Sequence, residues 1–336
     1  MNKVFVNYSL IAAITVVAVL MSCKHNPDDD DIVITDNECI ITLTTNQFTE
    51  IEFSMTGETK CQIDWGDGSE IEERSFSSLW EDHFQHRYLL DQSHTITITC
   101  KDVMSLTFSG NAFIGLDVSK DTVLKSLTFF DTEIANLDVS KNTALIVLDC
   151  NNNHRLTGLD LRNNTALQEL RCAYNRQFTE LDVSNNVKLT VLNCFDNELD
   201  ELDVTNCTAL KYLDCSFNRL HKLDVSKNVN LQQLHCHSNQ LSQLDVSQNV
   251  KLNFLICGNN QLTQLDMSNN TALENLDCSY NRLDVAALSA LFESLPGNNI
   301  QKYINIYNNP GTMQCRRSIA ENKGWRVYDG SGVVVP

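Results

Sequence analysis

Two histidines one residue apart, His235 and His237, have the type and spacing that most directly suggest chemistry. Side chains at positions i and i+2 of a strand project to the same side, so the pair can offer two nitrogen ligands to a zinc ion. Asp214 is a candidate third ligand from a neighbouring strand. Two histidines alone make a weak site, and the favoured interpretation is a water-facing pair that holds no metal.

Asp64, Asp67 and His86 form a second candidate metal or acid-base group. The segment 65–68 is Trp-Gly-Asp-Gly, and glycines on both sides of Asp67 indicate a tight turn with positive φ angles, which the aspartate caps. No nucleophile with a partner base, ordered Ser-His-Asp set, paired-carboxylate signature or phosphate-binding loop accompanies them in the sequence. The sequence therefore predicts no catalytic residue, no cofactor and no enzyme.

Cysteine is the third source of chemistry, since the chain holds 13. Seven of them recur every 21 or 22 residues: Cys150, Cys172, Cys194, Cys215, Cys236, Cys257 and Cys278. We expect each of these to point into a packed core as a small apolar side chain, which predicts free, unreactive thiols. Cys39, Cys61 and Cys100 precede the series. One pair of these three can form a disulfide, and the sequence does not choose which.

An internal repeat of 21 or 22 residues positions these side chains. A Leu-Asp-Val-Ser tetrad recurs in close variants, starting at Leu116, Leu137, Leu159, Leu181, Leu202, Leu223, Leu244 and Leu265. Between the tetrads runs Leu-x-x-Leu-x-Cys-x-x-Asn, with Phe108 and Phe129 in the cysteine position of the first two turns. This pattern, from Val103 to about Leu283, resembles the leucine-rich-repeat family. The resemblance implies a solenoid of nine turns that presents a face of short strands and is mostly used for binding proteins.

Stacking of the turns is expected to bury the leucines and cysteines and to leave Asp214 pointing outward. The asparagine three residues after each cysteine fits the family's ladder of stacked amides: Asn153, Asn175, Asn197, Asn218, Asn239, Asn260 and Asn281, with Thr132 as a departure. A second column follows the tetrads: Asn142, Asn164, Asn186, Asn228, Asn249 and Asn270, with Asp121 and Cys207 as substitutions. We expect both columns to be structural.

Residues 38–102 alternate with period two and are rich in threonine and isoleucine, which predicts a small all-β sandwich. The Trp-Gly-Asp-Gly segment, followed by His-Arg-Tyr at 86–88, resembles the PKD-like immunoglobulin fold. Downstream of the repeats, residues 285–295 have helical spacing and stop at Pro296. Residues 285–336 are expected to form a mixed α/β cap, with a second helix at 313–322 and a last strand near Trp325.

The N-terminus is predicted to be a targeting segment. Residues 1–22 resemble a bacterial lipoprotein signal peptide, in which Ser22 precedes Cys23 as the lipidated residue. An uncleaved anchor or an ordinary secretory signal is the alternative. Residues 23–37, which include four consecutive aspartates, predict an acidic, disordered tether. The remaining boundaries are 38–102 for the sandwich, 103–284 for the repeats and 285–336 for the cap.

Strand-face positions can be followed through the register of the repeats. Large side chains there concentrate in the middle turns, and we hypothesise that they form a binding patch: Phe195, Tyr212, Phe217, His235, His237, Phe254 and Ile256, with Tyr174 near its edge. Aromatic anchors are typical of both protein interfaces and sugar-stacking sites. The alternative is that outward positions carry scattered apolar residues without function.

The formal net charge of −18 and the lack of a clustered basic stretch disfavour a nucleic-acid partner. The sequence predicts a non-catalytic recognition protein of the bacterial cell envelope, held in the outer membrane by a lipid anchor and facing outward, or facing the periplasm as the alternative. Its partner is expected to be a host or envelope protein, bound in interaction or adhesion. A glycan-binding surface lipoprotein is the alternative function.

Overall fold

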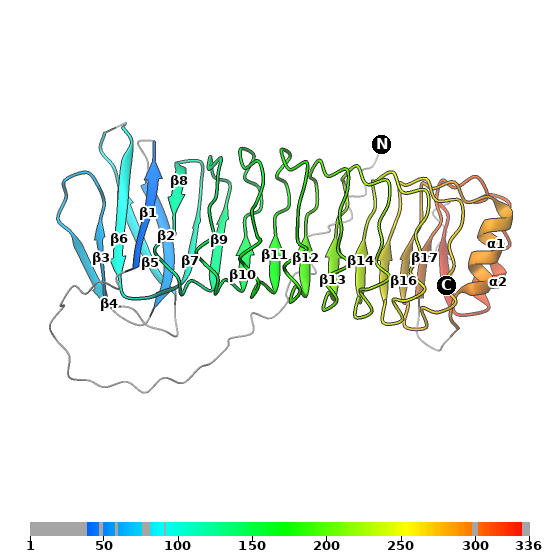
Figure 1. The fold of residues 1–336 in the computed structure, drawn as a ribbon. Helices are drawn as coiled ribbons and strands as arrows, with labels where there is room; N and C mark the ends of the chain where they lie inside the picture. Colours follow the sequence, from blue (N-terminus) through cyan, green and yellow to red (C-terminus); the bar gives the residue numbers. More distant parts are fainter. Residues whose placement is uncertain are drawn as a thin grey trace. The chain divides into compact units, whose positions relative to one another are not determined.

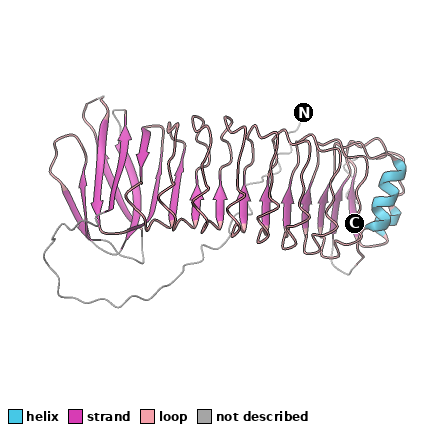
Figure 2. Ribbon diagram, in the orientation of Figure 1, coloured by secondary structure: helices cyan, strands magenta, loops and turns pink. Residues whose placement is uncertain are grey.

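The computed structural model describes residues 39–46, 50–57, 60–75, 81–90, 92–297 and 302–330. The predicted signal peptide, Cys23 and the acidic tether lie outside these residues. The described residues fold as two β-sheets and two helices (Figures 1 and 2). No helix among them is long and apolar enough to cross a membrane.

The first sheet has five strands in the order β4-β3-β6-β1-β8. Its strands are β1 (Cys39–Thr45), β3 (Lys60–Asp64), β4 (Glu72–Ser75), β6 (His94–Cys100) and β8 (Phe113–Asp117). Alternate residues of β1 and β6 are buried, including Ile41 and Ile98, as the period-two pattern of these segments predicts.

The second sheet has 13 strands and joins the sandwich to the solenoid without a break. Its first strands in spatial order are β5 (Asp82–Arg87), β2 (Glu50–Gly57), β7 (Val103–Ser109) and β9 (Ser126–Phe130). Strand β7 pairs antiparallel with β2 and parallel with β9, so it belongs to both parts. Strand β8 contains Leu116 of the first tetrad but pairs with β1 in the other sheet. A single apolar core runs from the sandwich through the repeats.

The remaining strands are parallel and come one per turn, side by side in Figure 1. They are β10 (Val147–Asp149), β11 (Glu169–Arg171), β12 (Val191–Asn193), β13 (Tyr212–Asp214), β14 (Gln233–His235), β15 (Phe254–Ile256), β16 (Asn275–Asp277), β17 (Lys302–Asn305) and β18 (Trp325–Tyr328). From β10 to β16, the central leucine of each strand and the cysteine that follows the strand are buried, as Leu213 and Cys215 illustrate at 0% exposure. The solenoid, its 21–22-residue period and the preceding sandwich are therefore confirmed.

Both asparagine columns tie neighbouring turns together. Asn218 donates from Nδ2 to the carbonyl of Cys194 in the preceding turn at 2.9 Å, and its Oδ1 accepts the N–H of Leu199 at 3.0 Å. In the second column, Asn228 donates to the carbonyls of Val204 and Cys207. The amides thus satisfy buried backbone groups at each turn, which is the structural role predicted for them.

Two short helices cap the far end of the stack. α1 (Val285–Ser294) begins at Asp284, whose carboxylate accepts the N–H of Ala287 at 2.8 Å, and it buries Leu288, Leu291 and Phe292. The second helix, α2 (Ser318–Glu321), is much shorter than the helix expected at 313–322. The residues before it form turns instead of a helix, in which the N–H groups of Gln314 and Cys315 both donate to the carbonyl of Gly311.

Candidate functional site

The strand face carries the columns that the repeat register predicts. Tyr212 lies opposite Gln233, which lies opposite Phe254, and Asp214 lies opposite His235, which lies opposite Ile256. Parallel, in-register pairing brings residues of equal repeat position to adjacent places. Residues about 21 apart in the chain therefore meet on one surface, in the middle of the solenoid.

Two ring clusters make up most of this surface, which we call the strand-face patch: Tyr174, Phe195, Tyr212, Phe217, His235, His237 and Phe254. In one cluster, Phe195 lies 5.0 Å from Tyr174 and 5.1 Å from Phe217 between ring centroids, and Phe217 lies 4.9 Å from His237. In the other, His235 lies between Tyr212 and Phe254, with 5.4 Å between centroids on either side.

Ile256 differs from the other predicted patch residues. It lies on the same face beside His235, but it is only 9% exposed. Neighbouring side chains therefore cover most of the surface that it could offer a partner. Six of the seven residues predicted for the patch make the ring contacts described above, and Tyr174 joins them.

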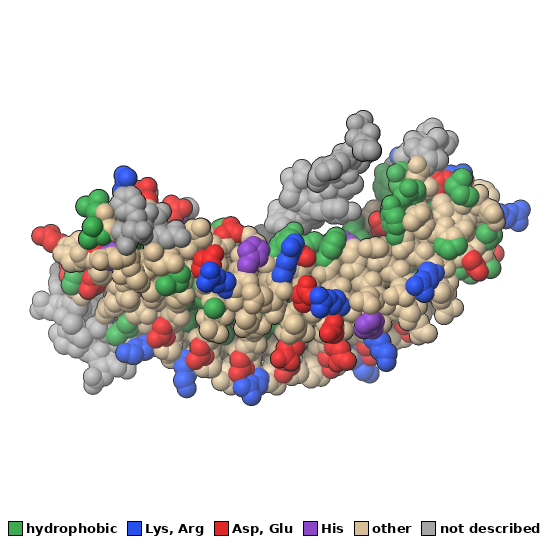
Figure 3. Space-filling model, turned by 90° about the horizontal axis from the view of Figure 1, so that it is seen from above, with side chains coloured by type: hydrophobic (Ala, Val, Ile, Leu, Met, Phe, Trp, Pro, Cys, Tyr) green, Lys and Arg blue, Asp and Glu red, His purple; other side chains and the backbone are tan. Residues whose placement is uncertain are grey.

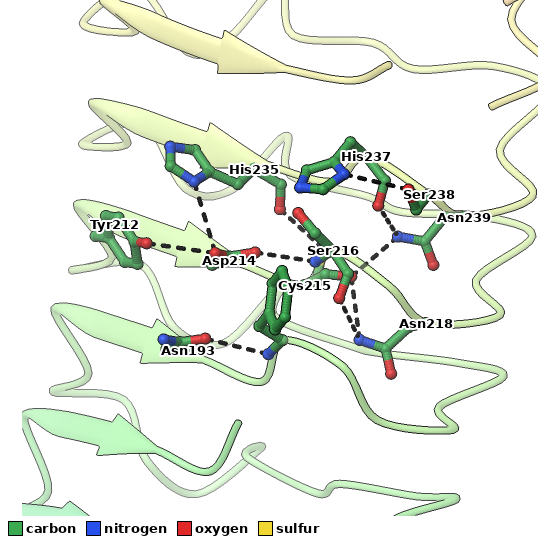
Figure 4. A network of polar contacts seen from close by, with 11 residues as sticks. Asn193, Tyr212, Asp214, Cys215, Ser216, Asn218, His235, His237, Ser238 and Asn239 are labelled. Carbon is green, nitrogen blue, oxygen red and sulfur yellow. Dashed lines mark hydrogen bonds and ion pairs between the residues drawn. The ribbon is translucent and has the colours of Figure 1, made fainter. Parts of the chain in front are cut away.

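Asp214 is the polar centre of the patch, and Figure 4 shows Tyr212 and His235 pointing toward it from β13 and β14. Its Oδ2 lies 3.5 Å from the Tyr212 hydroxyl and 3.6 Å from Nδ1 of His235, while its Oδ1 accepts the N–H of Ser216 at 3.0 Å. Burial alone would raise the pKa of Asp214, but contact with His235 and the hydrogen bond from the Ser216 backbone N–H hold it below its usual value. The patch therefore contains a carboxylate that is negatively charged at neutral pH.

Polar atoms beside this carboxylate lack partners. Nε2 of His235 and Oγ of Ser216 are buried and have no hydrogen-bond partner among the described residues. Burial also lowers the pKa of His237, which keeps its imidazole neutral at pH 7. A hydrogen-bond donor or acceptor supplied by a ligand or a water molecule would satisfy such groups.

One residue in each turn has a left-handed backbone, a feature that the sequence analysis did not identify. These residues precede the ladder asparagines: Asp131, Asn152, Tyr174, Asp196, Phe217, Ser238, Asn259, Tyr280 and Asn308, with φ between 51° and 61°. Short polar residues tolerate this conformation, whereas a bulky aromatic residue costs about 1–2 kcal/mol there. Tyr174, Phe217 and Tyr280 are nonetheless aromatic, with exposed fractions of 45%, 46% and 47%.

A tyrosine row near the cap was also missed from the sequence. The rings of Tyr280 and Tyr307 lie 5.3 Å apart, those of Tyr307 and Tyr328 lie 6.5 Å apart, and all three are between 39% and 47% exposed. Tyr280 occupies the same repeat position as Phe217. A comparison of the residues at that position in successive turns would have identified Tyr280 from the sequence.

The other candidate chemistry has structural explanations. Asp64 and Asp67 accept the N–H groups of Gly66 and Ser69 at 2.9 and 3.0 Å, as capping residues of the predicted turn. Nε2 of His86 lies 2.8 Å from Oδ2 of Asp67, and the His86 ring stacks on the Trp65 ring with 4.6 Å between centroids. Within the described part of the chain, no three His, Cys, Asp or Glu side chains are placed to hold a metal ion.

The cysteine series forms a row of buried thiols through the solenoid. All seven side chains are free and 0% exposed. Burial raises the pKa of each thiol, as it does for Cys215 and Cys257. A thiol with a raised pKa is a weak nucleophile, in agreement with the unreactive role predicted for the series.

Acidic and basic side chains occur together on the surface of the protein. Figure 3 shows acidic and basic side chains interspersed over the face that it presents. Several are paired, for example Arg171 with Glu169 at 2.8 Å and Arg176 with Asp196 at 2.9 Å. Such surface pairs contribute little to the free energy of unfolding. Asp214, in contrast, is a buried charge within the strand-face patch.

Comparison with known proteins identifies the repeat architecture. No protein-family model matches the sequence, and no curated protein is similar enough to match. The functional domain of InlJ from Listeria monocytogenes, which includes a cysteine ladder, is 31% identical with a TM-score of 0.57, over 69% of this chain and 55% of that chain. InlF, an internalin from L. monocytogenes str. 4b F2365, is 17% identical with a TM-score of 0.39, over 69% and 91% of the two chains. The match therefore spans little more than half of the InlJ domain, and the solenoid of this chain is a leucine-rich-repeat fold.

Proposed function

We propose that this protein is a non-catalytic recognition protein that binds a protein partner through the strand-face patch. The observation that carries the proposal is the presence of Tyr174 and Phe217 at left-handed positions. These rings cost conformational energy and remain 45% and 46% exposed, so burial does not compensate for the cost. A contribution to binding explains why aromatic residues occupy these positions, although asparagine there would make the protein more stable.

The composition of the patch favours a protein as the partner. Aromatic side chains are enriched at the centres of protein interfaces, and here they surround one buried carboxylate that could give the interface its specificity. The matching surface would bring an apolar side chain against Phe195 and Phe217 and a hydrogen-bond donor toward Asp214. The leucine-rich-repeat fold supports a binding role over a catalytic one.

The tyrosine row gives a second candidate function, glycan binding. Exposed rings at Tyr280, Tyr307 and Tyr328 follow one another along the last turns, and aromatic faces are a common stacking surface for sugars. We therefore include glycans among the probes of the binding experiment. Binding that depends on Tyr307 and not on Phe217 would favour this alternative.

The test of the proposal is Phe217→Asn, which separates binding from folding. We expect this change to raise the free energy of unfolding by about 1 kcal/mol, because asparagine adopts the left-handed conformation more easily. At the same time it should weaken binding at least tenfold. Arrays of purified envelope and host proteins and of glycans, probed with the natural chain, identify the partner, and the variant's affinity is then measured by calorimetry.

Val229→Ala is the matched control, because Val229 is 46% exposed, like Phe217, and lies outside the strand-face patch. The control should bind as the natural chain does. Unchanged affinity in Phe217→Asn would contradict the proposed patch. A loss of stability in that variant would instead assign the ring a structural role.

We further propose that the chain is displayed on the outer membrane through lipidated Cys23, with residues 38–102 as a PKD-like domain between anchor and solenoid. Support comes from the apolar start of the sequence and its Ser-Cys junction. Protease treatment of intact cells should remove the protein while a periplasmic marker survives, and Cys23→Ala should abolish lipid labelling. Full protection from protease would favour the periplasmic alternative.

A further inference from the structure

The carboxylate of Asp214 is short of hydrogen-bond donors. Its Oδ1 accepts the N–H of Ser216 at 3.0 Å, but its Oδ2 is contacted only at 3.5 Å by the Tyr212 hydroxyl and at 3.6 Å by Nδ1 of His235. Hydrogen bonds to an ionised carboxylate are usually about 2.5–2.9 Å long, so both contacts of Oδ2 are weak. The side chain of Asp214 is 12% exposed, so the rings of the patch do not seal it from outside.

Asp277, at the same repeat position three turns further on, has the donors that Asp214 lacks. Its Oδ1 accepts the N–H and the hydroxyl of Ser279 at 2.9 and 2.6 Å, and its Oδ2 accepts the amide of Asn305 at 3.0 Å. Among the described residues, no arginine or lysine forms an ion pair with Asp214. The shortage of donors is therefore a property of Asp214 and not of its repeat position.

His235 presents a second acceptor beside this carboxylate. An ionised carboxylate only accepts hydrogen bonds, so the proton of the His235 ring belongs on Nδ1, which faces Asp214. In the neutral ring Nε2 is then an acceptor, and it is buried without a hydrogen-bond partner among the described residues. A ligand group with several donors suits this surface better than a single hydroxyl.

The charges of the strand face favour a cation. Strands β10 to β16 place four carboxylates and one guanidinium at outward positions: Asp149, Glu169, Asp214, Asp277 and Arg171. The guanidinium is paired with Glu169 at 2.8 Å and does not neutralise the others. The patch also offers aromatic rings, and the faces of such rings attract cations. A basic group is therefore complementary to this surface, whereas an acidic group would be repelled.

We propose that the protein partner presents a basic side chain, an arginine or a lysine, whose cation binds Asp214 beside the ring of Tyr212. This inference rests on the binding function proposed above and names the group that the strand-face patch recognises. The cation supplies the hydrogen bonds that Oδ2 of Asp214 lacks. Its apolar stem lies along the neighbouring rings, as the stems of long basic side chains commonly do on apolar surfaces.

Selection of peptides tests the inference. A display library of random short peptides is selected on the natural chain, and the affinity of each selected peptide is measured by calorimetry for the natural chain and three variants. We expect the peptides that lose affinity for Phe217→Asn to contain an arginine or a lysine. The same peptides should bind Asp214→Asn about tenfold or more weakly. Asp277→Asn is the matched control in the same column and should bind as the natural chain does.

A change in the peptide checks the charge without altering the protein. Citrulline in place of the arginine, or acetyl-lysine in place of the lysine, removes the positive charge of the peptide. We expect this replacement to weaken binding to the natural chain about tenfold and to have little effect on binding to Asp214→Asn, because the two changes remove the same interaction. If Asp214→Asn does not fold, as judged by circular dichroism, the measurement on the natural chain still decides the question.

The outcomes separate this inference from the proposed function. Peptides that depend on Phe217 but contain no basic residue would overturn the inference and leave the patch in place. Unchanged affinity of a basic peptide for Asp214→Asn, or after replacement by the neutral residue, would do the same. If the selected peptides bind Phe217→Asn as tightly as the natural chain, the patch itself is wrong, and the inference fails with it.

Discussion

Asp121 takes the place that asparagine holds in the following turns of the second asparagine column. It is fully buried, its Oδ1 accepts the N–H of Val123 at 3.2 Å, and its Oδ2 has no hydrogen-bond partner among the described residues. Burial raises its pKa from 3.8 to about 6. The first turn of the column therefore carries a carboxylate whose ionisation opposes folding, at the junction of sandwich and solenoid.

Asp121→Asn should stabilise the protein above pH 6 and have little effect near pH 4. The folded pKa lies above the unfolded one, so the natural chain loses stability as pH rises from about 4 through 6, and the loss is constant above that. Asparagine carries no charge, and the gain at pH 7.5 should be about 1–3 kcal/mol. Urea unfolding of both proteins at pH 4 and 7.5 measures it. If the free energies of unfolding of the two proteins differ by the same amount at pH 4 and at pH 7.5, Asp121 does not lose its proton in this range.

At the scale of elements, the repeat period determined what the sequence could predict. Each turn has one strand of fixed length, so a single alignment predicted the columns that contain Tyr212 and His235, and the pairing of β13 with β14 confirms them. Burial of the cysteines followed from the same alternation. The ring contacts of the patch were partly predictable, because they depend on neighbouring columns whose order the register gives.

The features that the sequence did not reveal depend on backbone angles and on packing between segments. The left-handed residue of each turn varies from aspartate to tyrosine, so its shared φ is hidden by its changing type. Residues 103–117 read as repeat turns, because Phe108 takes the cysteine position of the repeat and Leu116 begins a Leu-Asp-Val-Ser tetrad. Only the pairing of β7 with β2 and of β8 with β1 shows that they also complete the sandwich.

At the scale of the whole molecule, the sandwich closes one end of the solenoid and the helices close the other. Phe53 of β2 lies opposite Phe108 of β7, and Phe108 stacks on Phe129 of the next turn with 5.6 Å between centroids. Apolar packing thus passes from sandwich to repeat through β7. A solenoid turn cannot bury its own apolar face, so the sandwich serves as the N-terminal cap.

Removal of the sandwich should therefore expose the first turn of the solenoid. A fragment of residues 103–336 leaves β7 as an open edge strand and uncovers Phe108 and Leu106, which are 2% and 0% exposed in the whole protein. We expect it to aggregate, to bind a hydrophobic dye and to melt at a lower temperature than the control, residues 39–336. Light scattering, dye fluorescence and circular dichroism measure these properties. If the fragment stays monomeric and melts with the control, the repeats close their own core and the sandwich is a separate domain.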